Sequence, residues 1–381
     1  MGSSMDGLAY RPALPHTSPA FARAWRRNRW PIFWALVYVC VGWAAAASIG
    51  LGERFSLTLY IWRSVLMFGV LAIACLAGGA IHLAGSLVIR RPADPAAFIG
   101  ATFRTRYRLS ERLMTGLPIL VVLALSASTF SSLKSMIPDF HPFDWDLTFI
   151  AWDRALHGGR DPWLILQPLL DHPLVTWSLN AAYHAWFFVL YGTVFFMAFR
   201  LRSPRLRAQF LLVYLLCWAI QGNLLATVFA SVGPVFYGPL IGAETAFTPL
   251  MAYLEAVSRD YPLSALQVQQ FLWDSYSAGS VVTGAGISAM PSLHVASSLL
   301  FALVFWRINR ALGVVMGLFL VAILLGSVHL GYHYAIDGYA AIVFTLAIWF
   351  GVGWLLDRDR GLGAGLRQPR PGLNLCGISA L

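Results

Sequence analysis

Two histidines and one aspartate in the last third of the chain have the types and spacing needed for nucleophilic and acid–base chemistry. His333 and Asp337 are four residues apart, so on a helix they share one face. A hydrogen bond from His333 to the Asp337 carboxylate would fix the imidazole tautomer and leave the other ring nitrogen as a nucleophile. His294 lies in a separate segment, where a histidine can protonate a leaving oxygen and later act as a base. We therefore predict one catalytic site containing His294, His333 and Asp337.

The segment just before His294 has the features of a helix start that could hold an anion. Pro291 suits the first turn of a helix, and Ser292 or Ser288 can cap it. Backbone N–H groups at such a start can bind phosphate. The glycines just upstream would allow a ligand to approach the backbone closely, and they are Gly279, Gly284 and Gly286. Substrate contacts are predicted at four positions, which are Ser292, His329, Arg259 and Tyr334.

The role of His329 is open on sequence grounds. It precedes His333 by four residues and shares its helical face, so it could support the site, pack against it or contact the substrate. Together with His294, His333 and Asp337 it could also form a nitrogen and oxygen ligand set for a metal. The acid–base scheme itself needs no metal and no other cofactor. A carrier without enzymatic activity is a further alternative, although polar residues threaded along several helices would favour it more than a cluster at one boundary.

Composition places these residues in a membrane protein. The chain has 381 residues, of which 58% are hydrophobic and only 12% are charged. A soluble protein carries about twice that charged fraction. The formal net charge of +10 could indicate nucleic-acid binding, but the arginines lie between apolar runs, as they do in membrane proteins. The four cysteines have neither a disulfide-framework spacing nor a metal-thiolate spacing.

Apolar runs long enough to span a bilayer predict an all-α, polytopic bundle of about eight transmembrane helices. The sixth run is the weakest, because it is short and begins in polar residues. We expect the first run to be an uncleaved anchor, with a cleaved signal peptide as the alternative. The runs cover residues 31–52, 64–89, 113–131, 174–199, 209–232, 289–306, 311–330 and 337–356.

Arginines predict the orientation of this bundle. Most of them fall in alternate connections, which contain Arg11–Arg29, Arg90–Arg112, Arg200–Arg207, Arg307–Arg310 and Arg358–Arg370. The positive-inside rule then places both termini in the cytoplasm and the predicted site at the opposite face of the membrane. Arginine bias over lysine suggests a bacterial inner membrane, with the site facing the periplasm or cell exterior. The oligomeric state cannot be derived from the sequence.

Two long connections, residues 132–173 and 233–288, lie on the same predicted side as the site. Long loops often carry function or cover a site. The stretch Pro138–Trp163 is predicted either as a helix lying in the membrane interface or as an ordinary loop. We divide the chain into an N-terminal part with two additional helices (1–112), a six-helix core (113–356) and a cytoplasmic tail (357–381) predicted to be disordered.

The PSLH motif (Pro291–His294), followed by HYAID (His333–Asp337), resembles the two sequence blocks of the type 2 phosphatidic acid phosphatase superfamily. The resemblance is closest to the branch containing inositol phosphorylceramide synthases. It implies a six-helix catalytic core in which His294 is the proton donor, His333 forms a phosphohistidine and Asp337 orients His333. GPVFYGP at Gly233–Pro239 and DRALHGG at Asp153–Gly159 also look like this branch.

The chain departs from the phosphatases of this superfamily in its positive charge. Ser327 stands where their second block usually has a phosphate-binding arginine, and the basic stretch Arg200–Arg207 falls on the cytoplasmic side. A dianionic phosphomonoester is best bound by several cationic donors, so fewer arginines favour a phosphodiester. Lys134, Arg160 or Arg259 could fold over the site and supply charge. The resemblance therefore implies a transferase that moves a phospho-headgroup from a phospholipid donor to a lipid-alcohol acceptor such as ceramide. A lipid phosphate phosphatase, with water as the acceptor, is the alternative.

Overall fold

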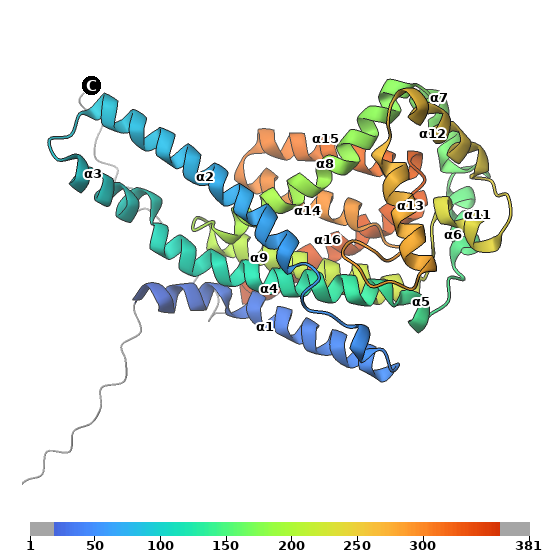
Figure 1. Cartoon of the computed structure of the whole chain (residues 1–381), viewed down its shortest axis with the longest axis horizontal. Helices are drawn as coiled ribbons and strands as arrows, with labels where there is room; N and C mark the ends of the chain where they lie inside the picture. The colour runs from blue at the N-terminus through green and yellow to red at the C-terminus, as the bar shows by residue number, and fades with distance from the viewer. Residues whose placement is uncertain (1–18, 359–381) are drawn as a thin grey trace, which may run out of the picture.

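The computed structural model describes residues 19–358, and within that range it contains helices and no strands (Figure 1). The predicted all-α membrane bundle is confirmed. Seven described helices are long and apolar enough to cross a membrane, and a shorter apolar helix, α14, lies where the sixth of eight spans was predicted. The eight are α1 (Pro19–Ser48), α2 (Ile61–Arg90), α4 (Leu109–Ser135), α8 (Pro173–Ala198), α9 (Pro204–Leu216) with its continuation through η3 (Cys217–Leu225) and α10 (Ala226–Val228), α14 (Leu293–Ile308), α15 (Arg310–His329) and α16 (Ala335–Arg358).

Helix α14 is short because it begins inside the sixth apolar run, at a turn capped by Ser292. It has 16 residues and is therefore about 24 Å long, less than the hydrocarbon thickness of a typical bilayer. It begins at Leu293 rather than at residue 289, and the residues before it are not helical. Helices α8, α9, α15 and α16 all contact α14, so this irregular backbone is enclosed by protein.

The first two spanning helices lie at the edge of the bundle. Helix α1 packs along α4 and α9, whereas α2 diverges from the bundle towards the short helices α3 (Pro95–Ala101) and η2 (Thr102–Tyr107) (Figure 1). Large apolar side chains are exposed along α2, including Val70, Ile73 and Leu76. Such side chains suit contact with lipid. The division of the chain into an N-terminal part, a core and a tail remains a prediction, and the tail lies almost wholly outside the described residues.

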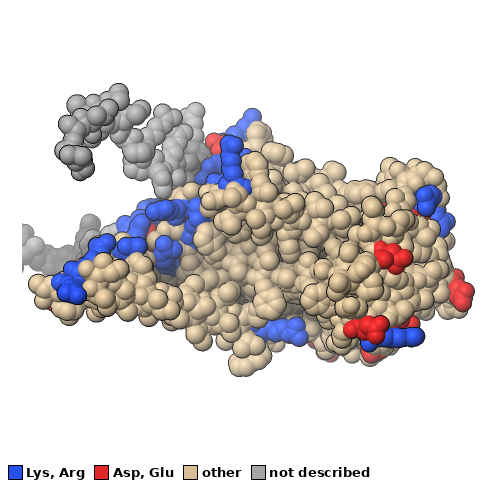
Figure 2. All heavy atoms as spheres, turned by 90° about the horizontal axis from the view of Figure 1, so that it is seen from above, with Lys and Arg blue, Asp and Glu red and all other residues tan. Residues whose placement is uncertain are grey.

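Charge differs between the two ends of the molecule. Lysine and arginine side chains gather at the end that contains α3 and η2, and most visible acidic side chains lie towards the opposite end (Figure 2). Among the described residues, Arg205 pairs with Asp357 at 2.7 Å. This separation agrees with the alternation of arginines along the sequence, while the assignment of either end to the cytoplasm remains a prediction.

The two long connections fold into short helices at the end opposite the arginines (Figure 1). The stretch 138–163 contains helix α6 (Asp146–Leu156), on which Phe149, Ile150 and Asp153 are buried, whereas Leu147 and Trp152 are exposed. That this helix lies in the membrane interface remains a prediction. The first connection contains α5 (Ile137–Phe140), α6 (Asp146–Leu156) and α7 (Pro162–Leu170). The second contains α11 (Pro234–Ile241), α12 (Thr248–Asp260) and α13 (Ser264–Ser277).

Two buried carboxylates on α6 bind backbone N–H groups of distant segments. The Asp153 carboxylate accepts hydrogen bonds from Ala335 N and Ile336 N, both at 2.8 Å, and so caps α16 from another part of the chain. The Asp146 carboxylate accepts from Val232 N (3.0 Å), Gly233 N (2.9 Å) and the Tyr334 hydroxyl (2.8 Å). Burial raises the pKa of both carboxyls above the usual value, and the N–H donors act against this shift.

Replacing Asp146 with alanine is expected to destabilise the protein, because two N–H groups and one hydroxyl would be buried without a partner. The expected cost is about 2–4 kcal/mol, seen as a fall of several degrees in the melting temperature in detergent. Asp144→Ala, two residues earlier, is the matched control, since Asp144 is exposed and should change stability by less than about 0.5 kcal/mol. Equal melting temperatures for the two variants would contradict this account of Asp146.

Candidate active site

His333 and Asp337 interact as their spacing predicts. Nδ1 of His333 donates a hydrogen bond to Oδ2 of Asp337 at 3.2 Å, and the same oxygen accepts from Tyr334 N at 3.0 Å. Asp337 is completely buried and His333 is 7% exposed. The backbone N–H of His333 also donates to the carbonyl of Ser327 at the end of α15. This arrangement fixes the ring and leaves Nε2 as the unprotonated nitrogen.

The two sequence blocks meet at the start of α14. Ser292 N donates to the backbone carbonyl of Asp337 at 3.2 Å, which joins the PSLH segment directly to α16. The hydroxyl of Ser292 accepts a hydrogen bond from Val295 N and is the cap of α14. Because Ser292 is buried and does not line the cavity described below, its interactions are those of a cap rather than of a substrate ligand.

His294 is held by aromatic rings. The Tyr183 ring stacks on it with centroids 4.3 Å apart and planes 18° apart, and the Trp186 ring lies 4.1 Å away at 39°. Trp186 Nε1 in turn donates to the Ser297 hydroxyl one turn further along α14, at 2.9 Å. Both aromatic residues lie on α8, so this helix sets the direction of the imidazole.

His294 and His333 line the same cavity, which has a volume of about 170 Å³. Helices α4, α8, η3, α11, α13 and α14 contribute to its wall, together with the glycine-containing segment before α14 and the turn before α16. Lys134 is the only lysine or arginine among the described residues that line it. Most of the remaining wall is apolar or aromatic, including Phe130, Phe187, Trp218, Phe236, Leu272 and Leu293.

The segment before α14 passes very close to Lys134. Gly286 has a φ of 95°, and a Cβ added to it would lie 2.9 Å from the backbone and the side chain of Lys134. Only glycine fits here without a shift. Gly284 and Gly286 both line the cavity, whereas Gly279 faces open space and its carbonyl accepts from Arg54. Two of the three glycines predicted to allow close approach are therefore at the cavity.

The other residues predicted to bind substrate lie elsewhere. His329 is buried and its Nε2 interacts with the Thr176 hydroxyl at 2.9 Å. Tyr334 is buried and its hydroxyl donates to Asp146. Arg259 is exposed on α12 and does not line the cavity. Their types suited binding, but long-range packing directs them away from the cavity.

A shared metal site involving His329 is not assembled in the described residues. No group of three or more histidine, cysteine, aspartate or glutamate side chains there is placed to hold a metal ion. Cys40, Cys75 and Cys217 are free thiols, and Cys376 lies outside the described residues.

Sequence reasoning missed the residues that position the site from a distance. Tyr183 and Trp186 contact His294 across more than a hundred residues of sequence, and Asp146 and Asp153 support the segment around His333. His184, which the sequence did not single out, also lines the cavity while its Nδ1 interacts with the Asn180 carbonyl. The acidic residues of DWDLTFIAWD and the aromatic residues of α8 are visible in the sequence. Their spacing does not show which distant residues they contact.

These features define a class: an integral membrane enzyme with an imidazole pair and one ammonium group around a small apolar cavity. A family model described as the PAP2 superfamily matches residues 147–351, which is more than half of the chain. The chain belongs to the PAP2 superfamily, whose members are phosphatases or phosphotransferases. Neither the curated proteins nor the solved structures contain a significant match.

Lys134→Met is expected to weaken the use of an anionic substrate, because it removes the one ammonium group of the cavity wall. A charge-assisted hydrogen bond contributes about 1.5–3 kcal/mol, so kcat/KM for a phospholipid substrate should fall roughly 10- to 100-fold. Lys134→Arg keeps the charge and is the matched control, with a smaller loss. An unchanged kcat/KM in Lys134→Met would show that the cation of the site lies elsewhere.

Proposed function

We propose that this protein transfers the phospho-headgroup of a phospholipid to a lipid alcohol, as inositol phosphorylceramide synthases do, with a phosphohistidine as the intermediate. The observation that carries the proposal is the placement of His294, His333 and Lys134 around one cavity. A nucleophile, a general acid and a cation are the three groups that such a displacement at phosphorus requires.

In the first step, Nε2 of His333 attacks phosphorus and the bond from phosphorus to the lipid alkoxide breaks. His294 gives its proton to that departing oxygen, which leaves as a lipid alcohol. Asp337 stabilises the positive charge that develops on His333, through the Nδ1 hydrogen bond of 3.2 Å. Lys134 compensates the negative charge on the phosphoryl oxygens.

In the second step, His294 takes a proton from the acceptor hydroxyl. The acceptor oxygen then attacks phosphorus, and the bond from phosphorus to Nε2 of His333 breaks. The phospho-headgroup has moved from one alcohol to another, and both histidines return to their starting protonation states. No oxidant, reductant or metal enters the scheme.

The charge of the cavity supports a phosphodiester donor. A phosphomonoester carries close to two negative charges and is best bound by several cationic donors, whereas a phosphodiester carries one. Lys134 supplies one positive charge among the described lining residues, and the arginine candidates Arg160 and Arg259 are exposed and do not line the cavity. The apolar wall suits the lipid portions of donor and acceptor.

Headgroup transfer by the purified protein in detergent tests this function. With a labelled phospholipid and a ceramide-like alcohol, we expect a labelled product that requires the alcohol. His333→Ala and His294→Ala should each reduce its rate at least about 1,000-fold, because each removes a reacting group. Asp144→Ala should retain activity. Release of headgroup phosphate without any acceptor would make the protein a lipid phosphatase, and lipid movement that survives His333→Ala would make it a carrier.

We also propose that the cavity opens to the non-cytoplasmic side, with both termini in the cytoplasm. Gly279 lies at the loop end of the bundle with open space around it, so Gly279→Cys should react with a membrane-impermeant thiol reagent in intact cells. The labelling is best done with Cys40, Cys75, Cys217 and Cys376 replaced by serine. Protection of the introduced thiol in intact cells, followed by labelling after lysis, would reverse the orientation.

A further inference from the structure

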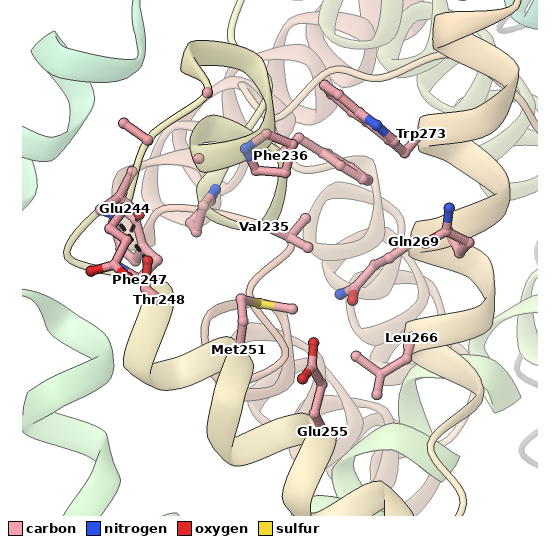
Figure 3. A pocket seen from close by; sticks show the side chains of 17 residues that line it. Val235, Phe236, Glu244, Phe247, Thr248, Met251, Glu255, Leu266, Gln269 and Trp273 are labelled. Atoms are coloured by element: carbon pink, nitrogen blue, oxygen red, sulfur yellow. Dashed lines mark hydrogen bonds between the residues drawn. The ribbon is translucent and has the colours of Figure 1, made fainter.

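A second cavity lies among the short helices at the loop end of the bundle, outside the site described above. We call it the outer pocket; it is formed by α11, α12 and α13 together with the turn between α11 and α12 (Figure 3). Its volume of about 690 Å³ is four times that of the cavity at His333. Phe236 lines both cavities, but neither His294 nor His333 lines the outer pocket. A volume of this size is typical of a small-molecule site.

The lining of the outer pocket accepts hydrogen bonds and carries no positive charge. Among the described residues that line it there is no lysine, arginine or histidine. The polar lining residues are Glu244, Thr245, Thr248, Glu255, Gln269 and Gln270. A phosphate group would therefore find no cationic partner here, in contrast to the cavity that contains Lys134.

Gln269 provides a buried acceptor with no partner. The residue is only 4% exposed, and its Nε2 donates to the Leu330 carbonyl at 2.8 Å. Its Oε1 has no hydrogen-bond partner among the described residues. Figure 3 shows the side chain reaching from α13 into the pocket, between Leu266 and Trp273. A buried carbonyl left without a donor costs about 1–3 kcal/mol, so a ligand that donates a hydrogen bond to it is favoured.

Aromatic rings form another part of the wall. Phe236 and Trp273 are stacked with ring centroids 6.0 Å apart and planes 11° apart. Figure 3 shows this pair above Val235 on the side of the pocket opposite Glu255. Flat aromatic surfaces with a few hydrogen-bonding groups suit a ligand that has both apolar C–H faces and hydroxyl edges.

The position of the charges indicates an uncharged ligand. Glu244 and Glu255 are exposed, so water and salt screen their carboxylates, whereas the buried polar group is the neutral amide of Gln269. We propose that the outer pocket binds a neutral, polyhydroxylated ring, such as a sugar or a cyclitol, either as a soluble molecule or as the headgroup of a glycolipid. A hydroxyl donates to Oε1 of Gln269, and further hydroxyls donate to the carboxylates at the rim.

The outer pocket borders the loop that carries His333. Nε2 of Gln269 donates to the Leu330 carbonyl, and Val235 N donates to the Gly331 carbonyl at 2.9 Å. Met251, on the wall of the pocket, would lie 3.3 Å from a Cβ added to Gly331. A bound polyol therefore sits behind the turn that precedes His333 and beside Phe236, which lines both cavities.

Binding can be tested independently of catalysis with the full chain carrying His333→Ala, purified in detergent. The soluble probes are myo-inositol, glucose and mannose, with choline and inorganic phosphate for comparison, observed by saturation-transfer NMR. A glucosyl diacylglycerol in nanodiscs represents the glycolipid source. Gln269→Leu and Trp273→Leu alter the pocket, and Gln267→Leu is the matched control, because Gln267 is exposed on the same helix and lines neither cavity.

We expect at least one polyol to bind with millimolar affinity or better, and both pocket variants to weaken it about tenfold, which corresponds to about 1.4 kcal/mol. Gln267→Leu should leave the affinity unchanged. Because Gln269→Leu also removes the bond to Leu330, Trp273→Leu keeps the test valid if the first variant does not fold. The proposal is overturned if no polyol or glycolipid binds, or if only choline binds and Glu255→Gln abolishes that binding.

Discussion

The buried start of α16 is the constraint on which the site depends. The first N–H groups of a helix have no partner within the helix, and here Ala335 and Asp337 at the helix start are buried. Asp153 supplies two acceptors to Ala335 and Ile336, and Asp337 supplies one to Tyr334. Once α16 is anchored in this way, the position of His333, one turn before Asp337, follows directly.

The same anchoring explains how two separate sequence blocks share one cavity. The Asp337 carbonyl accepts from Ser292, which caps α14, and this bond brings the start of α14 beside the start of α16. Helix α8 then supplies the aromatic rings against His294. In this arrangement backbone hydrogen bonds and ring packing position the imidazoles, and Lys134 is the single cation among the described residues of the wall.

The sequence predicted what depends on local spacing and composition. The all-α membrane bundle and the bond between His333 and Asp337 follow from hydrophobic runs and from helical periodicity, and both are found.

Features that depend on contacts between distant segments of the chain were not predicted. Tyr334 has the right type and place to contact a substrate, but Asp146, 188 residues away, binds its hydroxyl. Arg259 is likewise the right type, but the path of α12 leaves it exposed. Nothing local in the sequence distinguishes Asp146 and Asp153 from the acidic residues beside them.

Direct detection of the covalent intermediate tests the central claim most sharply. The protein would be mixed with a phospholipid carrying a labelled phosphate, without an acceptor, and quenched within a single turnover under alkaline conditions that preserve phosphohistidine. We expect a phospho-headgroup adduct on the peptide that contains His333, absent in His333→Ala and lost when lipid alcohol is added. An adduct on another residue, or turnover without any adduct, would contradict it.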